Sequence, residues 1–187
     1  GLEADVMGKI RLDKFLADMG LGTRSEVKKE IKKGSIQVNG MTVKNPEYKI
    51  DTGKDQVTAK GQQVSYAELE YYMLNKPAGV VSATEDKREK TVVDLITEKR
   101  RKDLFPVGRL DKDTEGLLLI TNDGALAHEL LSPRKHVDKT YFVKVKEPVS
   151  TEHVKLLETG VDIGEEKLTL PGKISRMALE RTSLCLT

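Results

Sequence analysis

The sequence predicts an α+β protein, and three observations lead to that prediction. Apolar residues recur at helical spacing near the start of the chain, and alternating residues flank an Asn-Gly pair soon afterwards. Beyond about residue 70, strand and helix patterns follow one another in mixed order. An α/β protein would instead alternate strands and helices regularly. We therefore expect a small domain of two helices and a hairpin, followed by a larger domain with a mixed, mainly antiparallel sheet.

The first two elements are helices. Apolar side chains at i, i+3, i+4 and i+7 predict the first one. They are Leu12, Phe15, Leu16 and Met19. Gly20 and Gly22 are suited to end this helix in a left-handed conformation. Residues 23–26 (Thr-Arg-Ser-Glu) have the form of a capping box, which predicts a second helix that ends at Gly34.

A hairpin follows these helices. Residues 36–38 and 41–43 alternate in polarity on either side of Asn39-Gly40. Asn-Gly is the strongest short hairpin signal, because both turn positions need a positive φ.

The domain boundaries follow from where these patterns stop. We expect a leader at residues 1–9, an N-terminal domain at residues 10–60, a polar linker at residues 61–70 and a second domain at residues 71–187. The chain ends inside an alternating strand pattern, so we expect the second domain to lack its C-terminal part.

The second domain has five predicted strands and three predicted helices. The strands are expected at 71–74, 116–121, 140–145, 173–177 and 183–187. The helices are expected at 91–98, 125–131 and 151–158. Ser150 is the expected N-cap of the last helix.

Composition excludes several classes of protein. No apolar run approaches the ~20 residues of a membrane span, and the N-terminus has no signal-peptide pattern. The single cysteine, Cys185, excludes a disulfide framework and a Cys-based zinc site. We expect a cytoplasmic monomer that does not contact membranes.

The second predicted helix carries a row of cations. Arg24, Lys28 and Lys32 recur at i, i+4 and i+8, so they share one face. Such a row suits a nucleic-acid backbone, where counterion release drives binding; a solvated helix face is the alternative. Because only Phe15 and Tyr48 are aromatic in this domain, recognition of RNA shape is favoured over base stacking.

The densest group of carboxylates lies at residues 108–116. Asp111, Asp113 and Glu115 match the first positions of an EF-hand loop, but the last position would be Asn122 instead of glutamate. We therefore expect no metal. No nucleophile signature surrounds the histidines, and no phosphate-binding glycine loop occurs, so we expect no cofactor. Asp111 then remains, either as a functional carboxylate or as an ordinary turn residue.

Longer motifs resemble two known families. Residues 11–16 (Arg-Leu-Asp-Lys-Phe-Leu), 23–26 and 34–40 resemble an S4 RNA-binding domain. Residues 108–124, which begin Gly-Arg-Leu-Asp, resemble the catalytic motif of RsuA-like ribosomal RNA pseudouridine synthases. Residues 74–79 (Leu-Asn-Lys-Pro-Ala-Gly) resemble that family's first motif, and residues 131–141 resemble its tyrosine-bearing stretch.

The resemblance implies an isomerase that converts a uridine of ribosomal RNA to pseudouridine. Asp111 would be the essential carboxylate, Tyr141 would stack on the target uracil, and Arg109 would contact the RNA or fill the space left by the base. The residues expected to bind RNA are Arg11, Arg24, Lys28, Lys32 and Lys76. Family members continue into a motif that supplies a cation for the catalytic aspartate, and residues 178–187 do not match it.

The resemblance favours small-subunit rRNA as the substrate, free or in an assembly intermediate. A large-subunit enzyme of the same family is one alternative. A non-catalytic rRNA-binding or ribosome-assembly protein is another.

Overall fold

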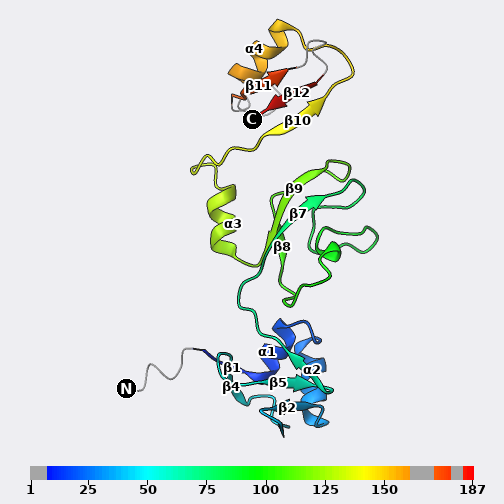
Figure 1. Cartoon of the computed structure of the whole chain (residues 1–187), viewed down its shortest axis with the longest axis vertical. Helices are drawn as coiled ribbons and strands as arrows, with labels where there is room; N and C mark the ends of the chain where they lie inside the picture. The colour runs from blue at the N-terminus through cyan, green and yellow to red at the C-terminus, as the bar shows by residue number, and fades with distance from the viewer. Residues whose placement is uncertain (1–7, 161–170, 178–182) are drawn as a thin grey trace. The chain divides into compact units, whose positions relative to one another are not determined.

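The computed structural model describes residues 8–160, 171–177 and 183–187 (Figure 1). The chain divides into two compact units, Gly1–Leu131 and Ser132–Thr187, each described here by itself. All strand pairs among the described residues are antiparallel, and helices accompany the sheets, which confirms the α+β class. Residues 1–7 of the expected leader, and residues 178–182 of the expected C-terminal departure from the family, lie outside the described residues.

The first part of unit one contains two helices, a four-stranded sheet and a two-stranded ribbon. The helices are α1 (Leu12–Asp18) and α2 (Arg24–Lys32). The sheet has the order β3-β2-β5-β6, with β2 (Ile36–Val38), β3 (Met41–Thr42), β5 (Val57–Ala59) and β6 (Gln62–Val64). The ribbon pairs β1 (Lys9–Arg11) with β4 (Lys49–Asp51).

Local signals in this part are confirmed. The Thr23 side chain accepts a hydrogen bond from the Glu26 amide at 3.2 Å and caps α2. Gly34 follows α2 with φ +85°. Asn39 and Gly40 both have positive φ between β2 and β3, as the hairpin requires. Buried apolar residues from α1, α2, β2, β4 and β5 form one core.

Two predicted boundaries in this part are corrected. Lys9, expected in the leader, begins β1 and is paired with Asp51. Residues 62–64, expected in the linker, form β6 and are paired with β5. β1 pairs with β4, a strand that is distant in the sequence, and no local pattern indicates such a pairing.

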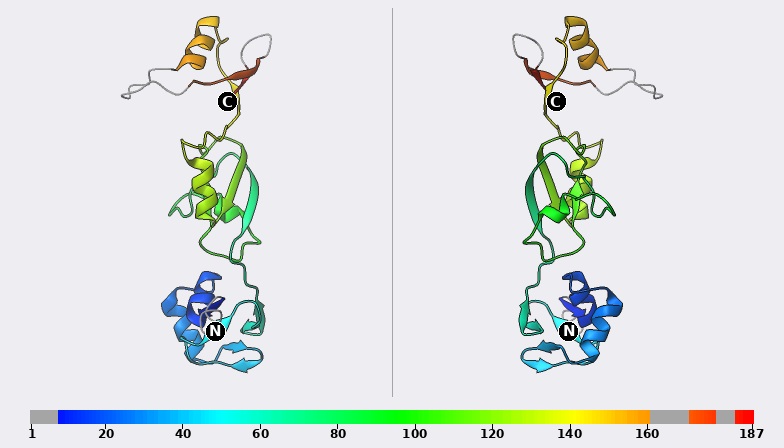
Figure 2. Two further views of the ribbon diagram at one scale, coloured as in Figure 1. Left: turned by 90° about the vertical axis from the view of Figure 1, so that its left-hand side faces the viewer. Right: turned by 90° about the vertical axis from the view of Figure 1, so that its right-hand side faces the viewer.

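The rest of unit one has a second sheet with the order β7-β9-β8. Its strands are β7 (Tyr71–Lys76), β8 (Phe105–Val107) and β9 (Gly116–Thr121). Helix α3 (Gly124–Leu131) lies beside this sheet (Figures 1 and 2). A second core of buried apolar residues includes Val80, Val92, Leu104, Leu118 and Ile120.

The helix expected at residues 91–98 is wrong. Only a 3-10 turn, η1 (Val93–Leu95), forms there. The Thr91 amide donates to the Asp94 carboxylate and the Asp94 amide donates to the Thr91 hydroxyl, so the chain turns once. Ile96 then returns to extended backbone and is buried with Val92 and Val93.

Unit two contains one sheet and one helix. The sheet has the order β10-β12-β11, with β10 (Tyr141–Lys144), β11 (Ile174–Met177) and β12 (Ser183–Leu186). Helix α4 (Thr151–Thr159) begins with the capping box expected at Ser150, whose partner is His153. Gly172 donates a backbone hydrogen bond to Leu157 of α4 at 2.7 Å, which ties the helix to the segment before β11.

No helix among the described residues has the length and apolar character to span a membrane. Among the same residues, no three His, Cys, Asp or Glu side chains gather where a metal ion could be held.

Candidate functional site

Asp111 lies on the loop that joins β8 to β9. Gly108 and Gly116 flank this loop with φ +88° and +138°. The Thr114 amide donates to the Asp111 carbonyl at 3.0 Å and closes a turn. The Asp111 and Arg109 side chains are exposed, and neither has a hydrogen-bond or ion-pair partner within the described residues. The Asp111 carboxylate is therefore available to a ligand.

Lys76 anchors this loop through hydrogen bonds to backbone carbonyl groups. Its side chain is fully buried, and Nζ donates to the carbonyl oxygens of Pro77 at 2.9 Å, Lys112 at 2.7 Å and Thr114 at 2.8 Å. An ammonium group has three N–H donors, so all of them are used. This corrects the expectation that Lys76 contacts RNA, because its charge is enclosed and its donors are satisfied by the protein.

Ser82 holds the loop on the other side of Asp111. Its buried hydroxyl accepts from the Leu110 amide at 3.0 Å and donates to the Leu110 carbonyl at 2.7 Å. The Gly79 amide donates to the Lys112 carbonyl at 2.9 Å. The backbone on both sides of Asp111 is thus fixed by the buried side chains of Lys76 and Ser82, while the carboxylate has no partner among the described residues.

Tyr141 belongs to unit two. It is the first residue of β10, paired with Leu186 of β12, and its side chain is exposed. An exposed aromatic ring at the end of a strand can stack on a flat ligand.

The structure brings three of the five expected RNA-binding residues together around one carboxylate. Arg11 donates from Nη2 to Asp13 Oδ2 at 2.9 Å, and Arg24 Nη2 lies 3.1 Å from Asp13 Oδ1. Lys28 Nζ lies 4.0 Å from Asp13 Oδ2. We call these four residues the Asp13 cluster. Lys32 is exposed at the end of α2 and has no contact with Asp13.

Asp13 stays ionised although it is buried. Burial alone would raise the pKa of this carboxyl, but hydrogen bonds from Arg11, Arg24 and the Lys14 amide outweigh it, so the pKa lies below its usual value. A negative charge at this position therefore coexists with the cations over the whole physiological range.

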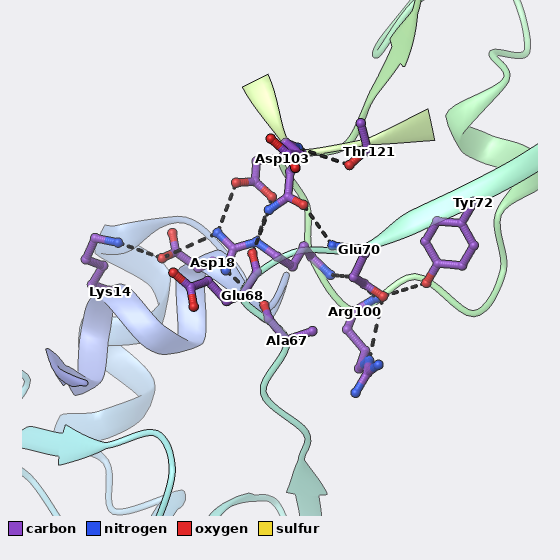
Figure 3. A network of polar contacts seen from close by, with 12 residues as sticks. Lys14, Asp18, Ala67, Glu68, Glu70, Tyr72, Arg100, Asp103 and Thr121 are labelled. Carbon is purple, nitrogen blue, oxygen red and sulfur yellow. Dashed lines mark hydrogen bonds and ion pairs between the residues drawn. The ribbon is translucent and has the colours of Figure 1, made fainter. Parts of the chain in front are cut away.

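A second polar network joins α1 to the sheet that follows (Figure 3). The Glu70 carboxylate accepts from the backbone amides of Arg100 at 2.9 Å and Arg101 at 2.6 Å, and from the Tyr72 hydroxyl. The Lys102 amide donates to the Asp18 carbonyl at 3.2 Å. Burial and the neighbouring Glu70 raise the pKa of Tyr72 to about 12. These hydrogen bonds link the end of α1 and the residue before β7 to the segment 100–102.

Sequence reasoning missed Asp13 and Ser82. Asp13 had a weak signal, since it follows Arg11 and stands among the apolar residues of α1 that were predicted to be buried. Ser82 had none, because a serine in a loop is usually exposed.

Comparison with known proteins gives two family matches. Residues 70–178 match the RNA pseudouridylate synthase family, and residues 10–57 match the S4 domain.

Individual relatives agree with these matches. An uncharacterized RNA pseudouridine synthase, YtzG of Bacillus subtilis, is 53% identical over 88% of this chain and 69% of its own length. Ribosomal large subunit pseudouridine synthase B of B. subtilis is 39% identical over 91% of this chain and 69% of its own. Ribosomal small subunit pseudouridine synthase A of Vibrio vulnificus is 37% identical over 95% of this chain and 76% of its own. A crystal structure of a pseudouridylate synthase matches with TM-score 0.57 and 33% identity, covering 95% of this chain and 76% of the other.

Proposed function

The chain belongs to the RNA pseudouridylate synthase family, and on that basis we propose that it isomerises one uridine of small-subunit ribosomal RNA through Asp111. In this reaction the bond between the ribose C1′ and uracil N1 breaks. The ring turns, a new bond joins C1′ to C5, C5 loses its proton and N1 gains one. The atoms balance without any further reactant.

The observation that supports Asp111 is the contrast between its fixed backbone and its free carboxylate. Leu110 and Lys112, its two neighbours, are hydrogen-bonded to buried groups of the β7 end and the following loop. The carboxylate has no partner among the described residues. Holding a catalytic group in place lowers the entropic part of the activation barrier. The group must also lack an internal ion-pair partner, so that it can react with the substrate.

Three routes are available to the Asp111 carboxylate. It can attack C1′ and form a glycosyl ester, attack the uracil ring, or remove a proton from the ribose. Each route begins from the ionised carboxylate. Arg109, exposed two residues earlier, is proposed to contact the RNA or to occupy the space left by the extruded base, whose unstacking costs a few kcal/mol. Tyr141 is proposed to stack on the uracil while it turns.

The proposal also specifies which ribosomal RNA is the substrate. Relatives named for the small subunit match over 88% to 95% of this chain, and a relative named for the large subunit matches over 91%. The stretch 131–141 favours the small-subunit group, and the large-subunit RNA is the second candidate because of its relative at 39% identity.

Tritium release tests enzyme, residue and substrate together. The substrates are unmodified small-subunit and large-subunit rRNA transcripts labelled with tritium at uridine C5. We expect release from the small-subunit transcript alone, and its loss in Asp111→Asn. Asp113→Asn is the matched control, since Asp113 is an exposed carboxylate on the same loop.

Two outcomes would contradict parts of the proposal. Release from large-subunit RNA alone would move the substrate to the second candidate. Undiminished release by Asp111→Asn would remove that residue from the chemistry.

A further inference from the structure

Asp13 is a buried charge within a surface that is otherwise expected to attract RNA. Its side chain has no exposed area, whereas Arg11, Arg24 and Lys28 remain 38%, 46% and 44% exposed. Each cation therefore turns one side toward the carboxylate and keeps another side in water. The three cations come from two different elements, β1 and α2.

The contacts of Asp13 fix the side-chain position of the neighbouring Arg11. Arg11 binds both carboxylate oxygens, with Nε at 3.1 Å from Oδ1 and Nη2 at 2.9 Å from Oδ2. Such a two-point contact fixes the plane of a guanidinium as well as its position. The Lys14 amide fixes the carboxylate in turn, at 2.8 Å from Oδ1.

Without Asp13 these cations would separate. Like charges at close range repel, and long side chains lose entropy when they are held in one place. A carboxylate in the centre offsets the repulsion and orders the side chains before any ligand arrives. Ordering a cation in advance lowers the cost of binding.

We propose that Asp13 is a positioning residue for RNA binding, which holds Arg11, Arg24 and Lys28 as one preorganised site for backbone phosphate oxygens of structured RNA. The inference rests on the proposed RNA substrate and adds a residue that does not touch the RNA itself. The donors of Arg11 and Arg24 that Asp13 does not engage bind the phosphate oxygens. Glu47, whose Oε1 lies 3.5 Å from Arg11 Nη2, is 71% exposed and is displaced when RNA binds.

This proposal and simple charge counting predict opposite results. Asp13→Asn preserves the shape of the side chain and removes one negative charge, so the net charge of the chain becomes more positive by one unit. If only the number of charges mattered, the variant would bind RNA more tightly, because each added cation favours a polyanion. If Asp13 positions the cations, the variant binds more weakly.

The experiment is a titration of unmodified small-subunit rRNA transcript, labelled with a fluorophore, by the full chain. We expect Asp13→Asn to raise Kd about tenfold. In steady-state tritium release the same change is expected as a higher KM rather than a lower kcat. Glu30→Gln is the matched control. It removes one negative charge from α2, where Glu30 pairs with Lys33 and Lys60, away from Asp13.

Glu30→Gln is expected to bind RNA as tightly as the unchanged chain or more tightly. An Asp13→Asn variant that behaves in the same way would overturn the proposal. Circular dichroism and thermal melting establish that each variant is folded.

If Asp13→Asn does not fold, Asp13→Glu takes its place. It keeps the net charge and every cation that contacts RNA, but its longer side chain cannot make the same two-point contact with Arg11. Unchanged RNA affinity in that variant overturns the proposal, and a weaker affinity supports it. A chain that binds RNA but releases no tritium would refute the proposed isomerisation and leave the comparison of affinities intact.

Discussion

The ammonium nitrogen of Lys76 lies 2.7 Å from the carbonyl oxygen of Lys112, the residue that follows Asp111. These residues are 36 positions apart in the chain, and the contact joins the end of β7 to the loop before β9. Lys76 does not face a substrate; it holds the loop that carries the candidate catalytic carboxylate.

The first prediction concerns this brace. Lys76→Met keeps a long side chain but leaves the carbonyls of Pro77, Lys112 and Thr114 without their donor. We expect a loss of about 2 kcal/mol in the free energy of unfolding, the usual cost of buried groups left unsatisfied, together with slower tritium release. Urea unfolding and the release assay measure the two effects. Lys112→Met, which removes an exposed ammonium paired with Glu89, is the control. Equal stability and equal turnover in Lys76→Met would contradict the assigned role.

The second prediction concerns Ser82. Ser82→Ala removes the hydroxyl that contacts both backbone groups of Leu110. Because Asp111 then becomes less well placed, we expect kcat to fall about tenfold with little change in KM. Ser82→Thr retains the hydroxyl and should recover most of the rate. If Ser82→Ala and Ser82→Thr lower kcat equally, the hydroxyl group does not position Asp111.

The third prediction concerns the exposed face of α2. Replacing Lys28 and Lys32 by alanine should weaken RNA binding and lower the salt dependence by about two phosphate contacts. Affinity for the rRNA transcript is measured at several salt concentrations. Lys54→Ala, an exposed lysine outside the helix, serves as the comparison. An unchanged slope in the double variant would exclude this face as the RNA contact.

The fourth prediction concerns acid stability. Burial alone would raise the pKa of Glu70, but hydrogen bonds from the Tyr72 hydroxyl and the Arg101 and Arg100 amides lower it below its usual value. A carboxyl with a lowered pKa in the folded state stabilises the fold above its unfolded pKa of ~4.3, and this contribution disappears as pH falls through the folded value. We expect the unfolding free energy to decline below about pH 4, and to decline less steeply in Glu70→Gln. Urea unfolding between neutral pH and pH 3 tests this, and parallel pH profiles would speak against Glu70.

Turns and helix caps were predictable because they depend on neighbouring residues. Asn39 and Gly40 adopt the positive φ that their types favour, and Thr23 and Ser150 cap the helices that follow them. The strands β7 and β9 were also visible, since six residues suffice to show a pattern. The helix expected at 91–98 does not form, because a single 3-10 turn is enough to bury Val92, Val93 and Ile96 in the core.

By itself the sequence determined the α+β class, the families and the position of Asp111 in its motif. The tertiary structure decided which charged residues face water and which do not. Asp13 and Lys76 are charged residues, yet both are buried, and each needs a partner from elsewhere in the chain: Arg24 for Asp13 and the Lys112 carbonyl for Lys76. A charge is stable inside a protein only where hydrogen bonds and opposite charges replace water, and those replacements exist only once distant segments have come together.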